Sequence, residues 1–424
     1  MESLVVGNNK FCFDFFQEIS KDDYGKNIFF CPLSLSAAFG MLRLGARNNT
    51  AQQIDEVLHF SEFSQNESKE PDPCLKSNKQ VPLDNSPEGP KKATGSSDVQ
   101  PESSSDESEL LSCYFGKLLS RLDGIKDYYT LSMANRLYSE QEFPICQSYL
   151  DGVLQFYHTT VESVDFQKNT EKSRQMINFW VECQCQGKIK ELFSKDAISN
   201  ATTLVLVNAV YFKAKWEKQF DCENTVDAPF FLSENEQKSV KMMNQSGLFR
   251  IGFIEELQAQ ILEMTYTTGK LSMFVLLPSP SEDNLKALQE LEKKISYEKI
   301  TTWSSLENLS EETVAISFPQ LTLEDSYDLN FVLQNMGMTD IFDETKADLT
   351  GISASPTLHL SKTIHKTFVE VDEAGSQAAA ASGTVVAEKS APLSVQFNAN
   401  RPFLFFIQHN KTRAILFYGR VCSP

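Results

Sequence analysis

The sequence predicts an α+β fold with several sheets, because helical and extended patterns alternate along one chain of 424 residues. Apolar runs at 203–212 and 270–278 are too short for buried helices and are rich in β-branched and aromatic residues, which favours central strands. The C-terminal third carries further strand-like runs, at 314–323, 366–371, 393–397, 402–409 and 414–421. With 41% hydrophobic residues, the chain can bury a large core.

The N-terminal region is predicted to be helical. Phe11, Phe15 and Ile19 recur every four residues, which places them on one face of an amphipathic helix. The stretch "NIFFCPLSLSAAFGMLRLGA" predicts a short strand, then a helix that begins at Pro32 and ends at Gly45.

Three further helices follow from local patterns. Thr50 with Gln53 predicts a capping box at the start of the next helix. Helices are also expected over 174–192 and 285–295, one before the strand at 203–212 and one after the strand at 270–278.

A polar segment, 61–109, interrupts the helical region. It carries 11 acidic residues against 5 lysines and almost no residues that could enter a core, so we expect a disordered insertion. We expect its run "ESSSDESE" to be part of a passive solvated loop, and a phosphorylated regulatory loop is the alternative.

Composition and motifs exclude several classes of protein. The net charge is −18 and no dense Lys/Arg cluster occurs, which argues against nucleic-acid binding. The N-terminus lacks the basic and apolar regions of a signal peptide, and no apolar run could span a membrane. Nine cysteines without framework spacing predict free thiols and a cytoplasmic protein. Neither metal-spaced pairs among the histidines nor any catalytic motif is found, so we expect no enzyme, no metal and no cofactor.

Seven stretches, taken in order, resemble one protein family. They are "NIFFCPLSLSAAFGMLRLGA", "NFWVECQCQGKIKELF", "LVNAVYFKAKW", "DLTGIS", "LSKTIHKTFVEVDEAG", "FNANRPFLFFI" and "ILFYGRV". This family is the serpins, and the chain is similar to their intracellular, ovalbumin-like branch, clade B. The resemblance implies one domain over 1–424 with three β-sheets, about nine helices and an exposed reactive-centre loop at 373–397. The insertion 61–109 would lie between the third and fourth helices, C and D, of the family.

The resemblance also implies a mechanism. An inhibitory serpin offers its loop to a serine protease, forms a covalent acyl-enzyme, and inserts the cleaved loop as a new strand into its largest sheet. Counting seventeen residues from the hinge predicts cleavage at Lys389–Ser390, and lysine before the cleaved bond suits a trypsin-like protease. The expected partner is therefore a trypsin-like serine protease bound covalently by a monomer. A non-inhibitory binding or storage protein and a cross-class inhibitor of papain-like cysteine proteases are the alternatives.

The segment before the reactive bond matches the hinge of the family. Glu373 corresponds to the hinge glutamate, Gly375 to the flexible glycine and Ser376 to the first residue to enter the sheet. The small and uncharged residues that follow suit a buried strand: Gln377, Ala378, Ala379, Ala380 and Ala381.

Residues beneath and above the insertion site complete the predicted site. Ser34, Asn208, Trp216 and His365 match the family pattern. Cys31 stands where the family usually has serine, which puts the local hydrogen bonding in doubt. Gln320 stands where many relatives have a basic partner for the hinge glutamate, so we expect the top of the sheet to open more easily.

Overall fold

The computed structural model describes residues 1–21, 25–61, 103–123, 129–233, 236–375 and 394–424. The α-helices within these ranges are α1 Glu2–Ser20, α2 Pro32–Gly45, α3 Asn48–Val57, α5 Ser103–Asp123, α6 Gln147–Tyr157, α7 Phe166–Gln184, α8 Asn284–Glu292, α9 Tyr297–Trp303 and α10 Leu329–Asn335. The strands are β1 Ile28–Phe30, β2 Tyr129–Glu140, β3 Val161–Val164, β4 Leu204–Ala214, β5 Val226–Ser233, β6 Glu236–Ile254, β7 Ala259–Thr265, β8 Leu271–Pro278, β9 Ser310–Pro319, β10 Leu321–Asp328, β11 Leu360–Val371, β12 Val395–Asn398, β13 Phe403–His409 and β14 Ile415–Val421.

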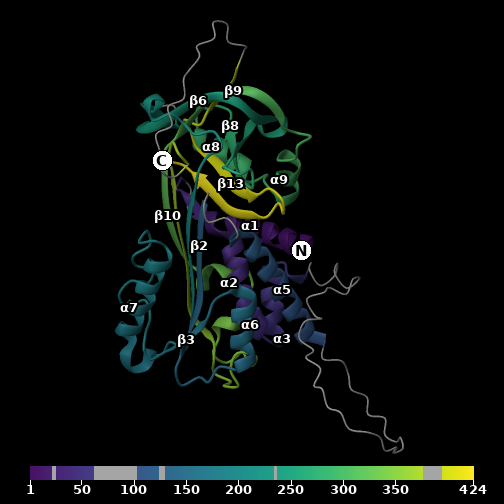
Figure 1. Cartoon of the computed structure of the whole chain (residues 1–424), viewed down its shortest axis with the longest axis vertical. Coiled ribbons are helices and arrows are strands. Elements are labelled where there is room, and N and C mark those ends of the chain that lie inside the picture. Colours follow the sequence, from purple (N-terminus) through teal and green to yellow (C-terminus); the bar gives the residue numbers. More distant parts are fainter. Residues whose placement is uncertain (22–24, 62–102, 124–128, 234–235, 376–393) are drawn as a thin grey trace, which may run out of the picture.

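A five-stranded sheet runs along the long axis of the molecule in the order β10-β11-β4-β2-β3 (Figure 1). The pairs β10–β11 and β2–β4 are antiparallel, whereas β11–β4 and β2–β3 are parallel. At its centre, β4 is buried along almost its whole length, which explains its continuous apolar sequence.

The remaining strands form a second sheet in the order β1-β14-β13-β8-β7-β6-β9-β12, with β5 paired to β6. Strand β6 is 19 residues long and links two parts of this second sheet. Its first part pairs with β5, its middle from Met242 to Ile251 pairs with β9, and its last part pairs with β7. The expected third sheet is therefore continuous with the second through β6.

Helices cover both faces of the five-stranded sheet. In Figure 1, α7 lies on one side, and α2, α5 and α6 lie on the other. Beneath α7, Ile177 and Val181 share an apolar cluster with Val205 and Val207 of β4. This layering confirms the predicted α+β class.

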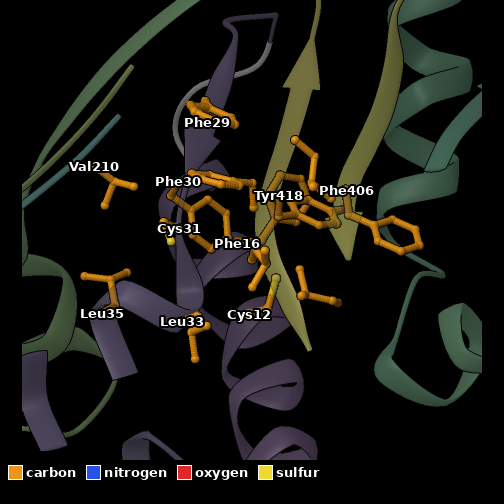
Figure 2. Packing of buried hydrophobic residues seen from close by; sticks show 14 of the residues in the cluster. Cys12, Phe16, Phe29, Phe30, Cys31, Leu33, Leu35, Val210, Phe406 and Tyr418 are labelled. Atoms are coloured by element: carbon orange, nitrogen blue, oxygen red, sulfur yellow. The ribbon is translucent and has the colours of Figure 1, made fainter. Parts of the chain in front are cut away.

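The main core lies where α1 and α2 pack against the second sheet. Figure 2 shows Phe16 of α1 against Tyr418 of β14, with ring centroids 4.8 Å apart. Phe29 and Phe30 of β1 extend the same aromatic cluster, and Phe29 stacks on Phe417 at 5.3 Å. These large buried rings explain why the N-terminal helix carries so many phenylalanines.

Several predicted boundaries are wrong. The run 314–323 was expected as one strand, but β9 ends at Pro319 and β10 begins at Leu321. Gln320 separates them because the chain there passes from the second sheet to the five-stranded sheet. Pro319 pairs with Met242, and Leu321 pairs with Val371. The helix expected over 174–192 begins instead at Phe166 and ends at Gln184.

The predicted insertion 61–109 lies mostly outside the described residues. Its end was placed too late, because residues 103–109 belong to α5. Acidic residues in the first turns of a helix interact favourably with its dipole, so their polarity does not exclude a helix. Likewise, residues 395–397 of the predicted loop 373–397 lie in β12, which pairs in parallel with β9.

Candidate functional site at the hinge of the five-stranded sheet

Strands β4 and β11 pair in parallel at the centre of this sheet. The two strands are in continuous register from Val205 opposite Lys362 to Phe212 opposite Val369, and the register shifts by one residue between Lys362 and Leu360. Their outer neighbours, β2 and β10, run antiparallel to them. A strand inserted between β4 and β11 and antiparallel to both would therefore replace one parallel ladder with two antiparallel ones.

A buried polar network joins β4 and β11 near the middle of this pairing. The Asn208 side chain donates to the Ser34 carbonyl at 2.8 Å, to Ser34 Oγ at 3.0 Å and to Asn135 Oδ1 at 2.8 Å. Its Oδ1 is hydrogen-bonded to Nδ1 of His365, which sits opposite it on β11. We call these residues, together with Cys31, the Asn208 network.

The backbone fixes the tautomer of His365. The N–H of Cys31 donates to His365 Nε2 at 3.0 Å, so Nε2 is unprotonated and Nδ1 carries the proton that reaches Asn208. Burial without a counter-charge disfavours the imidazolium and lowers the pKa of His365 to about 3. The histidine is therefore a neutral structural link between the strands at physiological pH.

This lowered pKa predicts a pH dependence of stability. The unfolded chain binds a proton at His365 near its ordinary pKa of 6.5, whereas the folded protein binds it only near 3. The His365 contribution is thus fully present above about pH 6.5 and is lost as the pH falls toward 3, by up to about 1.4 kcal/mol of unfolding free energy per pH unit. Denaturant unfolding between pH 7 and 5 measures the slope. His365→Gln should have a slope shallower by up to one proton, and an unchanged slope would contradict this assignment.

Cys31 preserves the local hydrogen bonding that its departure from the family pattern put in doubt. Its Sγ accepts from the backbone N–H of Ser34 at 3.4 Å, which caps the start of α2. Burial raises the pKa of the Cys31 thiol to about 12, so the side chain stays neutral and unreactive in the closed sheet.

The hinge is held at the upper end of the β4–β11 pair by Trp216. Its indole Nε1 donates to the carbonyl of Asp372 at 3.1 Å, and its backbone N–H donates to the carbonyl of Ala374 at 3.0 Å. The backbone N–H of Phe220 donates to the carbonyl of Glu373 at 2.8 Å. The residues that follow β11 are thus fixed to the segment that follows β4.

Gly375 occupies a position that only glycine fits. Its φ is +95°, and a Cβ built there would lie 2.4 Å from the carbonyl oxygen of Ala214 and 2.5 Å from the backbone nitrogen of Trp216.

Gly375→Ala is therefore expected to detach the hinge from Trp216 and to lower native stability by about 1–3 kcal/mol. The fluorescence of Trp216 and the thermal midpoint both report the change. Gly187→Ala is the matched control, since its φ is also positive at +75° but no atom lies within 4 Å of the added Cβ. Equal effects of the two substitutions would show that backbone strain alone matters and that Gly375 does not position the hinge.

The hinge glutamate is bound by neutral groups. Thr225 Oγ1 donates to Glu373 Oε1 at 2.6 Å, and Gln320 Nε2 donates to the same oxygen at 2.8 Å. Gln320 thus takes the place of a basic partner but supplies no charge. That the sheet opens more easily as a result stays a prediction.

The structure brings together Cys31, Ser34, Asn208 and His365, and separately Trp216, Gln320, Glu373 and Gly375. The reactive bond Lys389–Ser390 lies outside the described residues, as do Ser376, Gln377 and the alanines 378–381.

Sequence reasoning missed three members of this site. Asn135 of β2 completes the Asn208 network, Thr225 binds the hinge glutamate, and Thr367 Oγ1 donates to the carbonyl of Phe29 at 2.8 Å. Only the polarity of Asn135 and Thr367 inside apolar strands hinted at such roles.

Three further features of the described residues concern metal binding, membrane-spanning helices and cysteine thiols. In the part of the chain that the structure describes, no group of His, Cys, Asp and Glu side chains could hold a metal ion, and no helix is long and apolar enough to cross a membrane. The thiols of Cys12, Cys31, Cys146, Cys183, Cys185, Cys222 and Cys422 are free.

Comparison with known proteins places this geometry in context. The family model described as "Serpin (serine protease inhibitor)" matches residues 6–424. Human Serpin B12 is 73% identical over 424 residues, which cover 100% of both chains. Uncleaved ovalbumin is similar in structure, with a TM-score of 0.80 and 33% identity over 99% of this chain and 100% of that one. A loop-inserted structure of an ovalbumin mutant cleaved at its P1–P1′ bond matches with a TM-score of 0.78 and 32% identity over 99% and 100% of the two chains.

Proposed function

Because the chain belongs to the serpin family, in its ovalbumin-like branch, we propose that it is a suicide inhibitor of trypsin-like serine proteases. The protease would attack the bond between Lys389 and Ser390 and form an acyl-enzyme with Lys389. The cleaved loop would then enter the five-stranded sheet before the acyl bond is hydrolysed.

The observation that carries this proposal is the parallel pairing of β4 with β11. The loop leaves the end of β11, so a segment that folds back from there runs antiparallel to both strands. Insertion exchanges one ladder for two and gains on the order of ten backbone hydrogen bonds, each worth ~1 kcal/mol, or ~10 kcal/mol in total. That a similar fold exists in a loop-inserted form supports the geometry.

The residues of the hinge agree with this role. Glu373 and Gly375 are held by hydrogen bonds and close packing rather than by covalent constraint, so the hinge can detach. The sequence that follows contains no charge from Ser376 to Ala387, which suits a segment that becomes buried.

The proposal places a monomeric inhibitor in the cytoplasm, without cofactor or metal. The exposed thiols of Cys183 and Cys222, which form no disulfide, are consistent with a reducing compartment.

Incubation with trypsin followed by a denaturing gel tests the proposal. We expect an adduct that survives boiling in SDS, persists in Lys389→Arg and disappears in Lys389→Ala, because the S1 pocket of trypsin binds a basic side chain. Clean cleavage without an adduct would contradict inhibition and favour a binding protein. An adduct formed with papain-like cysteine proteases but not with trypsin would establish the cross-class alternative.

A further inference from the structure

Helix α7, which lies at the side of the molecule in Figure 1, carries exposed apolar side chains on the face opposite the sheet. Ile177 and Val181 are buried in the cluster beneath the helix. On the other face, Met176 is 45% exposed, Phe179 is 69% exposed, and the Cys183 thiol is also exposed. Single exposed apolar residues are common, but a continuous row on one helix face is typical of an interaction surface.

The exposed row has the spacing of a coiled-coil seam. Its four side chains follow one another at intervals of four, three and four residues, and we call them the α7 stripe: Lys172, Met176, Phe179 and Cys183. All four lie after Asn169, where the backbone angles of α7 are not helical, so the spacing belongs to a regular helix. The alkyl part of a lysine can pack in such a seam while its ammonium stays in water. A second helix is therefore the partner that this spacing fits.

The charges beside the α7 stripe are complementary to those of a second copy of the chain. Lys172 and Glu182, near opposite ends of the stripe, form no ion pair among the described residues, whereas Arg174 of the same helix forms two. Two copies of α7 can lie antiparallel, with a twofold axis between Met176 and Phe179. Lys172 of each copy then stands level with Glu182 of the other, so the symmetry brings opposite charges together twice. A parallel pair would place lysine against lysine.

We propose that two copies of this chain associate weakly and reversibly through their α7 stripes, antiparallel, with Phe179 of each copy against Met176 of the other. Thioether and aromatic groups attract each other in such contacts. The stripe spans about 17 Å of helix, so the pair buries well under the ~1,200 Å² of a stable interface. The net charge of −18 on each copy also opposes association. We expect a dissociation constant on the order of 100 µM, so the chain is a monomer at the lower concentrations of an inhibition assay.

Sedimentation velocity of the full-length chain from about 1 to about 500 µM, with a reducing agent present, tests the association. The weight-average sedimentation coefficient of the unmodified protein should rise with concentration. Phe179→Asp should remove this rise, because the substitution places a charge in the centre of the pair. Phe331→Asp is the matched control, since Phe331 is 68% exposed but lies on α10, and this variant should associate like the unmodified protein.

Exchange of the two charges tests the antiparallel register. Lys172→Glu or Glu182→Lys alone should weaken association roughly threefold or more, since each substitution places like charges together at both ends of the pair. The double substitution should restore the affinity to within about twofold of that of the unmodified protein. A double variant that associates as weakly as the single variants would contradict the pairing of Lys172 with Glu182.

A disulfide cross-link gives a second measure of the register. In Lys172→Cys, mild oxidation should join the introduced thiol to Cys183 of the other copy and give a dimer on a non-reducing gel. Within one copy the two positions are about 17 Å apart along the helix, too far for a disulfide. Cys222→Ser is included throughout, because Cys222 is another exposed thiol, and adding Cys183→Ser should abolish the dimer.

Three results would overturn the proposal and leave the α7 stripe to a helix of another protein. They are a sedimentation coefficient that does not rise up to about 500 µM, equal association of Phe179→Asp and the unmodified protein, and no cross-linked dimer in Lys172→Cys.

Discussion

On the proposed mechanism, Ser376→Arg is expected to convert an inhibitor into a substrate. The substituted protein should be cleaved at Lys389–Ser390 as readily as the original, but the SDS-stable adduct should disappear. On the proposed mechanism, this residue is the first to enter between β4 and β11, since it follows Gly375, which packs against Ala214 at the end of β4. Burying an unpaired arginine there costs several kcal/mol in rough terms, a large part of the ~10 kcal/mol gained by insertion.

The reason for so large an effect is kinetic. Insertion competes with hydrolysis of the acyl-enzyme, and each 1.4 kcal/mol added to the barrier of insertion slows it about tenfold. A few kcal/mol are enough for hydrolysis to release active protease in most encounters. The number of inhibitor molecules consumed for each protease inactivated should rise at least tenfold.

Ser376→Val is the matched control. Valine is uncharged and accepted within strands, so trapping should persist. An arginine variant that forms the adduct in normal yield would refute insertion at this position, even if the wild-type protein inhibits trypsin.

Asn208→Ala is expected to destabilise the closed form of the sheet selectively. The side chain makes three hydrogen bonds as a donor and holds His365 across the β4–β11 pair. Its loss leaves the buried Nδ1–H of His365 without its acceptor and Oδ1 of Asn135 with one donor fewer. We expect a loss of about 3 kcal/mol or more of native stability, seen as a fall of several degrees in the thermal midpoint.

The loop-cleaved form should respond differently. With a strand inserted, β4 and β11 would stand about 10 Å apart, twice the spacing of neighbouring strands, so Asn208 could not reach His365. Its removal should then cost much less. Thermal unfolding of the intact and cleaved proteins, side by side, measures the difference.

Asn178→Ala provides the control for this comparison. Asn178 is a buried asparagine of α7 whose side chain binds the backbone of Leu192 and Phe193 and does not span the β4–β11 pair. We expect it to destabilise the intact and cleaved forms alike. If both substitutions lower both midpoints equally, the Asn208 network does not hold the sheet closed.

Strand β4 of the five-stranded sheet could be predicted because it is buried on both faces, which leaves a continuous apolar signal. The run at 203–212 was found as β4 with only its ends displaced. The transfer from β9 to β10 at Gln320 was missed, since nothing in a run of alternating residues reports that its two halves pair with different sheets.

Local patterns failed where distant contacts override them. Thr50 and Gln53 suggested a capping box, but α3 begins at Asn48, and neither side chain caps it. Thr50 Oγ1 accepts from the backbone N–H of Asp348 at 2.9 Å, and Gln53 Oε1 accepts from those of Thr339 and Asp340. These two polar side chains of α3 therefore bind the backbone of residues 339–348, about three hundred residues away in the sequence.

The candidate site shows the same division. Family resemblance identified Cys31, Asn208, His365, Gln320 and Glu373, but it could not show how they are bonded. That Gln320 contacts Glu373 directly, and that the Cys31 N–H selects the histidine tautomer, depend on strand register and could only be seen in three dimensions.

The two ends of the reactive-centre loop are attached to different sheets, since β11 belongs to the five-stranded sheet and β12 belongs to the second sheet. If the loop is cut and its first part enters the five-stranded sheet, the two new chain ends are carried apart, and no relaxation brings them together again. Each molecule could therefore act only once. The amount of target protease that a cell can inactivate would be set by the number of chains it synthesises and not by an equilibrium constant. Each cleaved chain would correspond to one reaction with a protease molecule.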